Sequence, residues 1–129
     1  MSDGGAGSRQ MRIGARGEDL ACVRLRDAGY AIVERGFRTR EGEVDIIARD
    51  GDTTVFVEVK TRSGSSYGGP LAAVTPAKQA KVCRAAIAYL QANDLWDAPC
   101  RFDVVGIVTG RGEPTVTHVQ NAFTCDEGM

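Results

Sequence analysis

Residues 42–62 read Gly-Glu-Val-Asp-Ile-Ile-Ala-Arg-Asp-Gly-Asp-Thr-Thr-Val-Phe-Val-Glu-Val-Lys-Thr-Arg, and this stretch predicts two adjacent β-strands that carry charged residues inside them. Asp45 lies among valine, isoleucine and alanine, and Glu58 and Lys60 lie among valine and phenylalanine. Carboxylates and lysines are almost never fully buried unless they are paired or bind a metal. The pattern therefore indicates that these three charges need a counter-ion.

The turn at Asp50-Gly51-Asp52 predicts a hairpin, and the turn decides how the two carboxylates meet. If the last two of these residues form a two-residue turn, Asp45 lies directly opposite Glu58. If the turn is centred on the first two, the carboxylates are diagonal neighbours. In either register they lie on one face of the sheet, about 5–8 Å apart at Cβ.

Two like charges this close in a half-buried sheet destabilise it unless something compensates them. One carboxylate could stay protonated, Lys60 and nearby arginines could neutralise the pair, or a divalent cation could bind between them. Hard oxygen ligands of this kind suit Mg²⁺ or Mn²⁺. A purely structural ladder is the alternative, in which Glu43 pairs with Lys60 and Asp45 pairs diagonally with Arg62.

Glu18 is a further acidic candidate in the first predicted helix. It shares one helix face with small and apolar residues, namely Ala21, Cys22, Leu25 and Ala28. The inward position would make Glu18 a third carboxylate near the core. It could equally be a first-turn glutamate that the helix dipole favours.

The remaining elements follow from spacing, capping and turn residues. In chain order we expect a helix at 14–28, strands at 30–37, 43–49 and 54–62, a helix from the Thr75 cap to about Asn93, and strands at 102–108 and 115–119. The order α-β-β-β-α-β-β predicts an α/β (α+β) fold in which helices pack on a mixed sheet.

The chain of 129 residues is long enough for one domain with a sizeable core, which we place at residues 13–123. We expect a disordered tail at 1–12, a Ser/Gly-rich loop at 63–70 and a C-terminal tail at 124–129. The N-terminus lacks the apolar stretch of a secretory signal, and no apolar run approaches the length of a membrane span. We therefore expect a cytoplasmic protein with no membrane association.

The four cysteines, Cys22, Cys83, Cys100 and Cys125, form no Cys-x-x-Cys pair, and the one histidine, His118, is distant from them in sequence. A zinc site is therefore not expected. For a protein of the cytosol, four reduced thiols are the simpler prediction.

The net charge of −1 argues against nucleic-acid binding, but the charge distribution favours it. Residues 59–93 carry five basic residues and no acidic one; these are Lys60, Arg62, Lys78, Lys81 and Arg84. The last three fall on one side of the second helix, opposite its apolar side. This basic segment could contact a phosphate backbone, or it could be an ordinary solvated face.

The acids and the lysine together resemble a known nuclease signature. Glu18 in a helix, Asp45 on a strand and Glu58-Val59-Lys60 on the next strand resemble the PD-(D/E)xK nuclease superfamily. More narrowly, residues 13–123 resemble the YraN-like family of small bacterial endonuclease-like proteins, which is similar to archaeal Holliday-junction resolvases. The motifs that carry this resemblance are Gly14-x-x-Gly17-Glu18, Phe56 to Arg62, the Lys78 helix, Arg101-Phe102-Asp103 and Asn121-Ala122-Phe123.

The resemblance implies a restriction-endonuclease-like core and a role for each site residue. Asp45 and Glu58 would bind Mg²⁺ or Mn²⁺ together with the Val59 carbonyl, Lys60 would be the catalytic lysine, and Glu18 would complete the site. The implied substrate is nucleic acid, DNA rather than RNA, with branched DNA as one form of it. The resolvases act as dimers, so the resemblance also suggests a homodimer.

Two other functions remain open at this point. One is a nucleic-acid-binding protein whose nuclease site is vestigial. The other is a small protein whose charged hairpin is structural and whose basic helix binds a partner.

Overall fold

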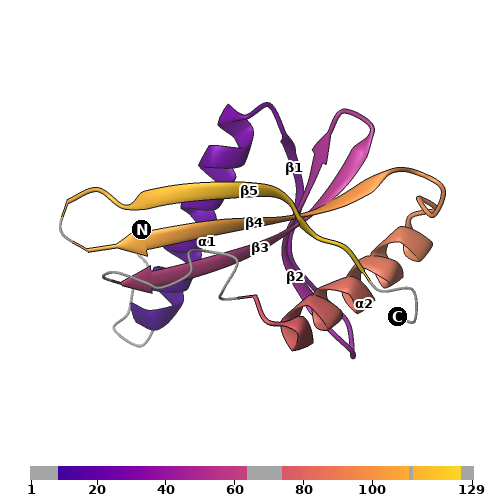
Figure 1. The fold of residues 1–129 in the computed structure, drawn as a ribbon, viewed down its shortest axis with the longest axis horizontal. Coiled ribbons are helices and arrows are strands. Elements are labelled where there is room, and N and C mark those ends of the chain that lie inside the picture. The colour runs from indigo at the N-terminus through magenta and orange to yellow at the C-terminus, as the bar shows by residue number, and fades with distance from the viewer. Residues whose placement is uncertain (1–8, 64–73, 111, 126–129) are drawn as a thin grey trace, which may run out of the picture.

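The computed structural model describes residues 9–63, 74–110 and 112–125. It contains two helices and five strands in these residues (Figure 1). In chain order they are α1 (Arg9–Asp27), β1 (Ala31–Arg38), β2 (Glu43–Asp50), β3 (Thr53–Ser63), α2 (Pro76–Ala92), β4 (Cys100–Thr109) and β5 (Thr115–Phe123). The predicted element order α-β-β-β-α-β-β is confirmed.

The strands form one mixed sheet in the order β1-β2-β3-β4-β5. All neighbouring pairs are antiparallel except β3 and β4, which run parallel. A parallel pair needs a crossover connection, and α2 lies in that connection. The mixed α/β sheet that the sequence predicts is thus confirmed.

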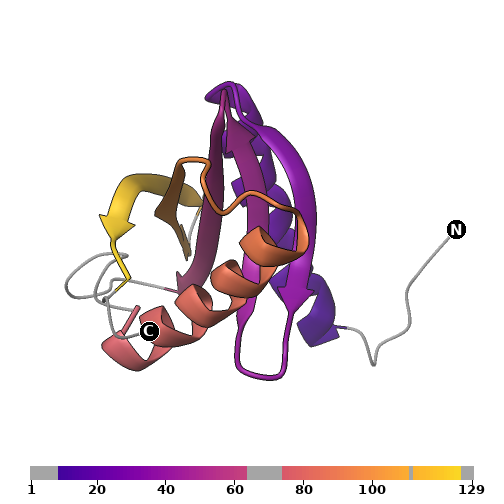
Figure 2. The same cartoon turned by 90° about the vertical axis from the view of Figure 1, so that its right-hand side faces the viewer.

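The two helices lie on opposite faces of the sheet, so the protein has two cores (Figure 2). The α1 core contains Ala21, Cys22, Leu25, Tyr30, Ile46, Ala48, Val55, Val57, Val105 and Ile107. The α2 core contains Val44, Ile47, Phe56, Val82, Cys83, Ala85, Ala86, Tyr89, Leu90 and Phe102. The central strands are apolar on both faces because each face is covered by a helix, which explains their nearly continuous hydrophobic runs.

The helix boundaries differ from the prediction at one end and agree at the other three. Helix α1 begins at Arg9 rather than Gly14, so residues 9–12 of the expected tail are helical. Thr75 caps α2 as predicted, with its side chain accepting a hydrogen bond from the Lys78 N–H at 3.3 Å. Neither described helix is long and apolar enough to cross a membrane. The rest of the expected N-terminal tail and almost all of the expected loop after Ser63 lie outside the described residues.

A buried polar network that the sequence analysis did not anticipate joins β4 and β5 on the α1 side. Asp103 is fully buried and accepts hydrogen bonds from Arg101 Nε at 3.0 Å and from the Asn121 N–H at 2.9 Å. The His118 ring bonds its other oxygen at 2.7 Å. Burial alone would raise the pKa of Asp103, but these hydrogen bonds outweigh burial and hold the pKa below its ordinary value.

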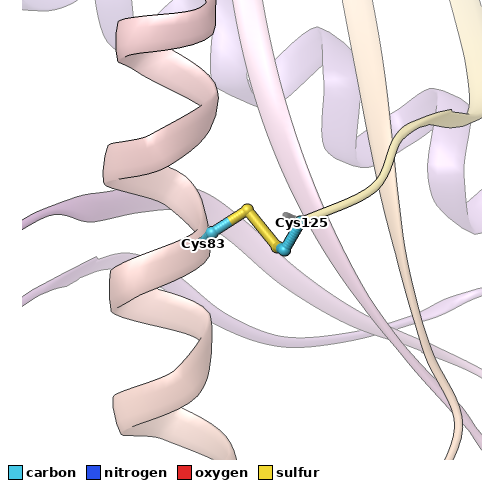
Figure 3. Close-up of a disulfide and its surroundings, with 2 residues drawn as sticks. All are labelled: Cys83 and Cys125. Carbon is cyan, nitrogen blue, oxygen red and sulfur yellow. A yellow bond between two sulfur atoms is a disulfide. The ribbon is translucent and has the colours of Figure 1, made fainter. Parts of the chain in front are cut away.

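The prediction of four reduced cysteines is wrong for two of them. Cys83 of α2 and Cys125, which follows β5, form a disulfide across a sequence separation of 42 (Figure 3). Cys22 remains free and buried, and Cys100 remains free and exposed. The pair shows no local sequence pattern, because the fold alone brings Cys125 to the side of α2. Cys125, which was expected to lie in a tail, is therefore anchored.

We expect reduction of this disulfide to lower the free energy of unfolding by about 2–4 kcal/mol, because the bond restricts the unfolded chain. Denaturant unfolding with and without a reducing agent measures the difference, and Cys125→Ser should reproduce the reduced value. Cys22→Ser is not a suitable control because Cys22 is in the core. In Cys100→Ser the reductant should still have its full effect. A midpoint that does not respond to reductant in the wild type would contradict the prediction.

Candidate active site

The hairpin of β2 and β3 has the register that a two-residue turn predicts. Asp50 pairs with Thr53 and Ile46 pairs with Val57, so Gly51 and Asp52 form the turn. One further step in the same register places Asp45 opposite Glu58. The sequence left two registers open, and the structure selects the one in which the carboxylates face each other.

The Asp45 side chain bonds to the main chain at the point where the regular pairing of β2 and β3 ends. Its Oδ2 accepts a hydrogen bond from the Val59 N–H at 2.8 Å. This bond ties the side chain of Asp45 to the main chain of the residue that lies between Glu58 and Lys60.

Glu58 is the most strongly perturbed acid of the site. It is buried, with 8% of its surface exposed, and its Oε2 lies 3.4 Å from Lys60 Nζ. Burial and the charge of Asp45 raise the pKa of Glu58 from 4.5 to about 7. Burial also raises the pKa of Asp45, although the Val59 N–H and Lys60 favour its ionised form. One lysine does not compensate the two carboxylates.

Lys78 joins this cluster from the first turn of α2. Lys78 lies near Lys60, and the Lys60 ammonium lowers the pKa of Lys78. Burial acts to lower the pKa of Lys60, but the carboxylates of Glu58 and Asp45 outweigh burial and raise it. The structure therefore brings together two carboxylates and two lysines, and the sequence had placed Lys78 only on the outer basic helix.

Glu18 does not join the carboxylate pair. Its Oε1 lies 3.3 Å from the Arg35 guanidinium of β1, and Asp19 contacts the same guanidinium at 2.9 Å. In the parts of the chain that the structure describes, no group of three or more acidic, histidine or cysteine side chains could hold a metal ion. The site therefore contains two carboxylates, and Glu18, the third predicted acid, forms an ion pair with Arg35 instead.

The structural ladder that the sequence left open is not formed as expected. Glu43 pairs with Arg38 of β1 at 3.1 Å, on the exposed surface, rather than with Lys60. Asp45 bonds to the Val59 N–H. The expected ion pairs between β2 and β3, from Glu43 to Lys60 and from Asp45 to Arg62, are therefore not observed among the described residues.

A groove lies between the β1–β2 turn and α2, and Glu43 in its wall is two residues from Asp45 along β2. We call it the basic groove because three of its five charged side chains are basic. It has a volume of about 420 Å³ and is lined by Arg38, Thr39, Arg40, Glu41, Gly42, Glu43 and Lys81. Gly42 sits directly against the main chain of Lys81, where any Cβ would overlap the carbonyl oxygen. The absence of a side chain at this position lets the turn close against the helix.

The basic residues predicted to bind nucleic acid are all exposed. Arg62 lies near the end of β3, and Lys78, Lys81 and Arg84 lie on the outer side of α2. Arg38 and Arg40 line the groove as well but were not predicted, because they lie outside the basic segment at residues 59–93. Their position two to four residues before Gly42 was the available signal.

Comparison with known proteins identifies the family. The model of the uncharacterised protein family UPF0102 matches residues 17–107, which is most of the chain and includes the carboxylates and both lysines. A UPF0102 protein of Geobacter sulfurreducens is 50% identical over 121 residues, covering 92% of this chain and 94% of the relative. One of Rhodococcus jostii is 47% identical over 117 residues, covering 90% and 99%. The chain therefore belongs to the UPF0102 family, which agrees with the YraN-like resemblance.

The raised pKa of Glu58 predicts how stability depends on pH in metal-free buffer. The folded state disfavours the ionised carboxylate, so stability should fall as the pH rises from about 4.5 through about 7. Glu58→Gln should remove much of this slope, and at pH 8 it should be more stable than the wild type by about 1–3 kcal/mol. Urea unfolding across this pH range measures the effect.

Glu34→Gln is the matched control, because Glu34 is an exposed glutamate of β1 outside the site. Its pH profile should follow the wild type. A destabilised Glu58→Gln protein at pH 8 would show instead that Lys60 fully compensates the charge, as in a structural ion pair.

Proposed function

We propose that this protein is a metal-dependent endonuclease that hydrolyses phosphodiester bonds of DNA. The observation that carries the proposal is the pair of half-buried Asp45 and buried Glu58, whose pKa values are both raised and which lie near Lys60 and Lys78. The arrangement supports the resemblance to the PD-(D/E)xK nucleases at Asp45, Glu58 and Lys60. Glu18 supports it less, because it pairs with Arg35.

The residues fit a hard divalent cation. Mg²⁺ is commonly held by one or two carboxylates, with water and substrate phosphate as the remaining ligands. Asp45, Glu58 and the Val59 carbonyl would hold Mg²⁺ or Mn²⁺, and Glu18 remains a proposed ligand only if it leaves Arg35. A bound ion of this kind would polarise a phosphoryl oxygen and make a bound water a better nucleophile.

The two lysines supply the positive charge that phosphate chemistry requires. Lys60 is mostly buried, with 19% of its side chain exposed, so its ammonium is fixed by Glu58 rather than free in solvent. It can orient the attacking water and stabilise the charge that develops on the phosphate. Lys78 adds a second cation from a helix whose N-terminus is fixed by Thr75.

The activity test compares two substitutions with a remote control. Asp45→Asn and Lys60→Ala should each lower Mn²⁺- or Mg²⁺-dependent cleavage by at least about 100-fold, because removal of one charge-stabilising group typically costs this much. Arg26→Ala, on the outer side of α1, should cleave as the wild type does. Circular dichroism should show that all variants are folded.

Linear, single-stranded, flapped and four-way-junction DNA should all be assayed, with RNA for comparison. A wild type inert on every one of these in both metals would refute the proposal. A thermal shift with Mn²⁺ that Asp45→Asn abolishes would show ion binding independently of cleavage.

The basic groove supports nucleic acid as the substrate class. Arg38, Arg40 and Lys81 line it, and Lys78 and Arg84 continue the positive charge along α2. Glu43 in its wall is two residues from Asp45 along β2, so a bound backbone would pass close to the site. Phosphate contacts of this kind bind without reading sequence.

The combined substitution Arg40→Ala and Lys81→Ala, made in the Asp45→Asn protein, should weaken DNA binding. It should also reduce the dependence of log K on log salt concentration by about 0.9 for each phosphate that the protein no longer neutralises. Fluorescence anisotropy at several salt concentrations measures both quantities. Adding Arg26→Ala instead should change neither, and an unchanged salt slope in the groove variant would place the DNA elsewhere.

The second candidate function is nucleic-acid binding through a vestigial site. The engagement of Glu18 by Arg35 favours it, because the metal site then has only two acids. This function is distinguished from the first if the wild type cleaves no DNA and the Asp45→Asn variant still binds DNA.

We also propose that the protein is a homodimer, because two-fold symmetry suits a two-fold DNA junction. Sedimentation measures the oligomeric state.

A further inference from the structure

Three of the four cysteines lie around one cavity on the α2 side of the sheet. The cavity has a volume of about 490 Å³, and its lining includes Cys83, Cys100, Cys125 and the side chains of Trp96 and Phe102. Cys83 and Cys125 are the disulfide, and Cys100 is a free and exposed thiol. A free thiol and a disulfide therefore line the same cavity.

The pairing of β4 with β5 explains why Cys100 and Cys125 line the same cavity. Phe102 of β4 pairs with Phe123 of β5, and their rings stack with centroids 5.2 Å apart. Cys100 lies two residues before Phe102, at the start of β4, and Cys125 lies two residues after Phe123, just beyond the end of β5. Both cysteines line the cavity beside this stacked pair.

Cys100 is exposed to solvent, whereas Cys22, the fourth cysteine, is not. Cys22 is only 1% exposed and belongs to the α1 core on the other face of the sheet. Cys100 opens to solvent, although the packing around its sulfur raises its pKa. Its thiolate, which is the attacking species, therefore becomes more abundant as the pH rises.

We propose that Cys100 is the third member of a thiol–disulfide exchange site with Cys83 and Cys125. The Cys100 thiolate attacks Sγ of Cys125, the new bond forms between these two sulfurs, and the bond between Cys125 and Cys83 breaks. The electron pair leaves on Sγ of Cys83, which takes up a proton. The step needs no external oxidant or reductant, because one disulfide replaces another.

The two disulfides restrain different parts of the protein. The bond to Cys83 fastens the segment after β5 to α2, whereas the bond to Cys100 would fasten it to β4. Exchange therefore releases α2, the helix that carries Lys78 and Lys81, while the C-terminal segment stays anchored. This inference does not depend on nuclease activity, since it concerns only which sulfurs are joined.

The test uses the wild-type protein, oxidised and free of added thiol. Samples incubated between pH 7 and pH 9.5 are quenched with acid, labelled with a thiol-specific reagent, digested and mapped by mass spectrometry. We expect peptides joined through Cys100 and Cys125, with Cys83 labelled. Their rate of appearance should rise about tenfold per pH unit while the pH is below the thiol pKa.

Two variants extend the test. Cys100→Ser should hold the bond between Cys83 and Cys125 at every pH. Cys83→Ser, treated with an excess of oxidised glutathione as the oxidant, should form a bond between Cys100 and Cys125 within one chain and release reduced glutathione. Cys22 should stay unlabelled until the protein is unfolded, which makes it the internal control. If the Cys83→Ser variant does not fold, the disulfide mapping of the wild-type protein is sufficient to test the proposal.

Three wild-type results would overturn the proposal. These are a single disulfide at every pH, a product that joins Cys83 to Cys100, or a Cys100 bond between two chains on a non-reducing gel.

Discussion

The hydrogen bond from the Val59 N–H to the Asp45 carboxylate is the contact on which the site depends. It forms where the regular pairing of β2 and β3 ends, so a side chain takes the place of a main-chain partner. This bond ties Asp45 to the residue between Glu58 and Lys60. It is also the largest of the interactions that favour the ionised form of Asp45 beside a second carboxylate.

Helix α2 connects this hairpin to the second half of the sheet and completes the site. Because β3 and β4 run parallel, the chain must cross over a face of the sheet between them. That crossing brings Lys78 to Lys60 and presses Lys81 against Gly42 of the β1–β2 turn. The same helix thus supplies a charge to the site and one wall of the basic groove.

The two buried acids Asp103 and Glu58 show how partners, rather than burial, decide the charge state. Both are almost completely buried. Three donor groups hold the pKa of Asp103 below its ordinary value, whereas the pKa of Glu58 is raised because a second carboxylate faces it. Asp103 is satisfied by its own protein and stabilises the fold. Glu58 has Lys60 beside it but also faces Asp45, and a carboxyl group whose pKa is raised in this way is typical of a functional position.

Local rules determined the element order, the mixed sheet and the Thr75 cap, and they limited the hairpin to two registers, because each depends on residues close in sequence. They also identified Asp45, Glu58 and Lys60, since charges inside apolar strands are visible in the sequence. Tertiary structure alone decided the rest. It paired Glu18 with Arg35, added Lys78 to the site and joined Cys83 to Cys125. Each of these depends on where a helix or a chain end packs, and that position is set by the whole core rather than by any local pattern.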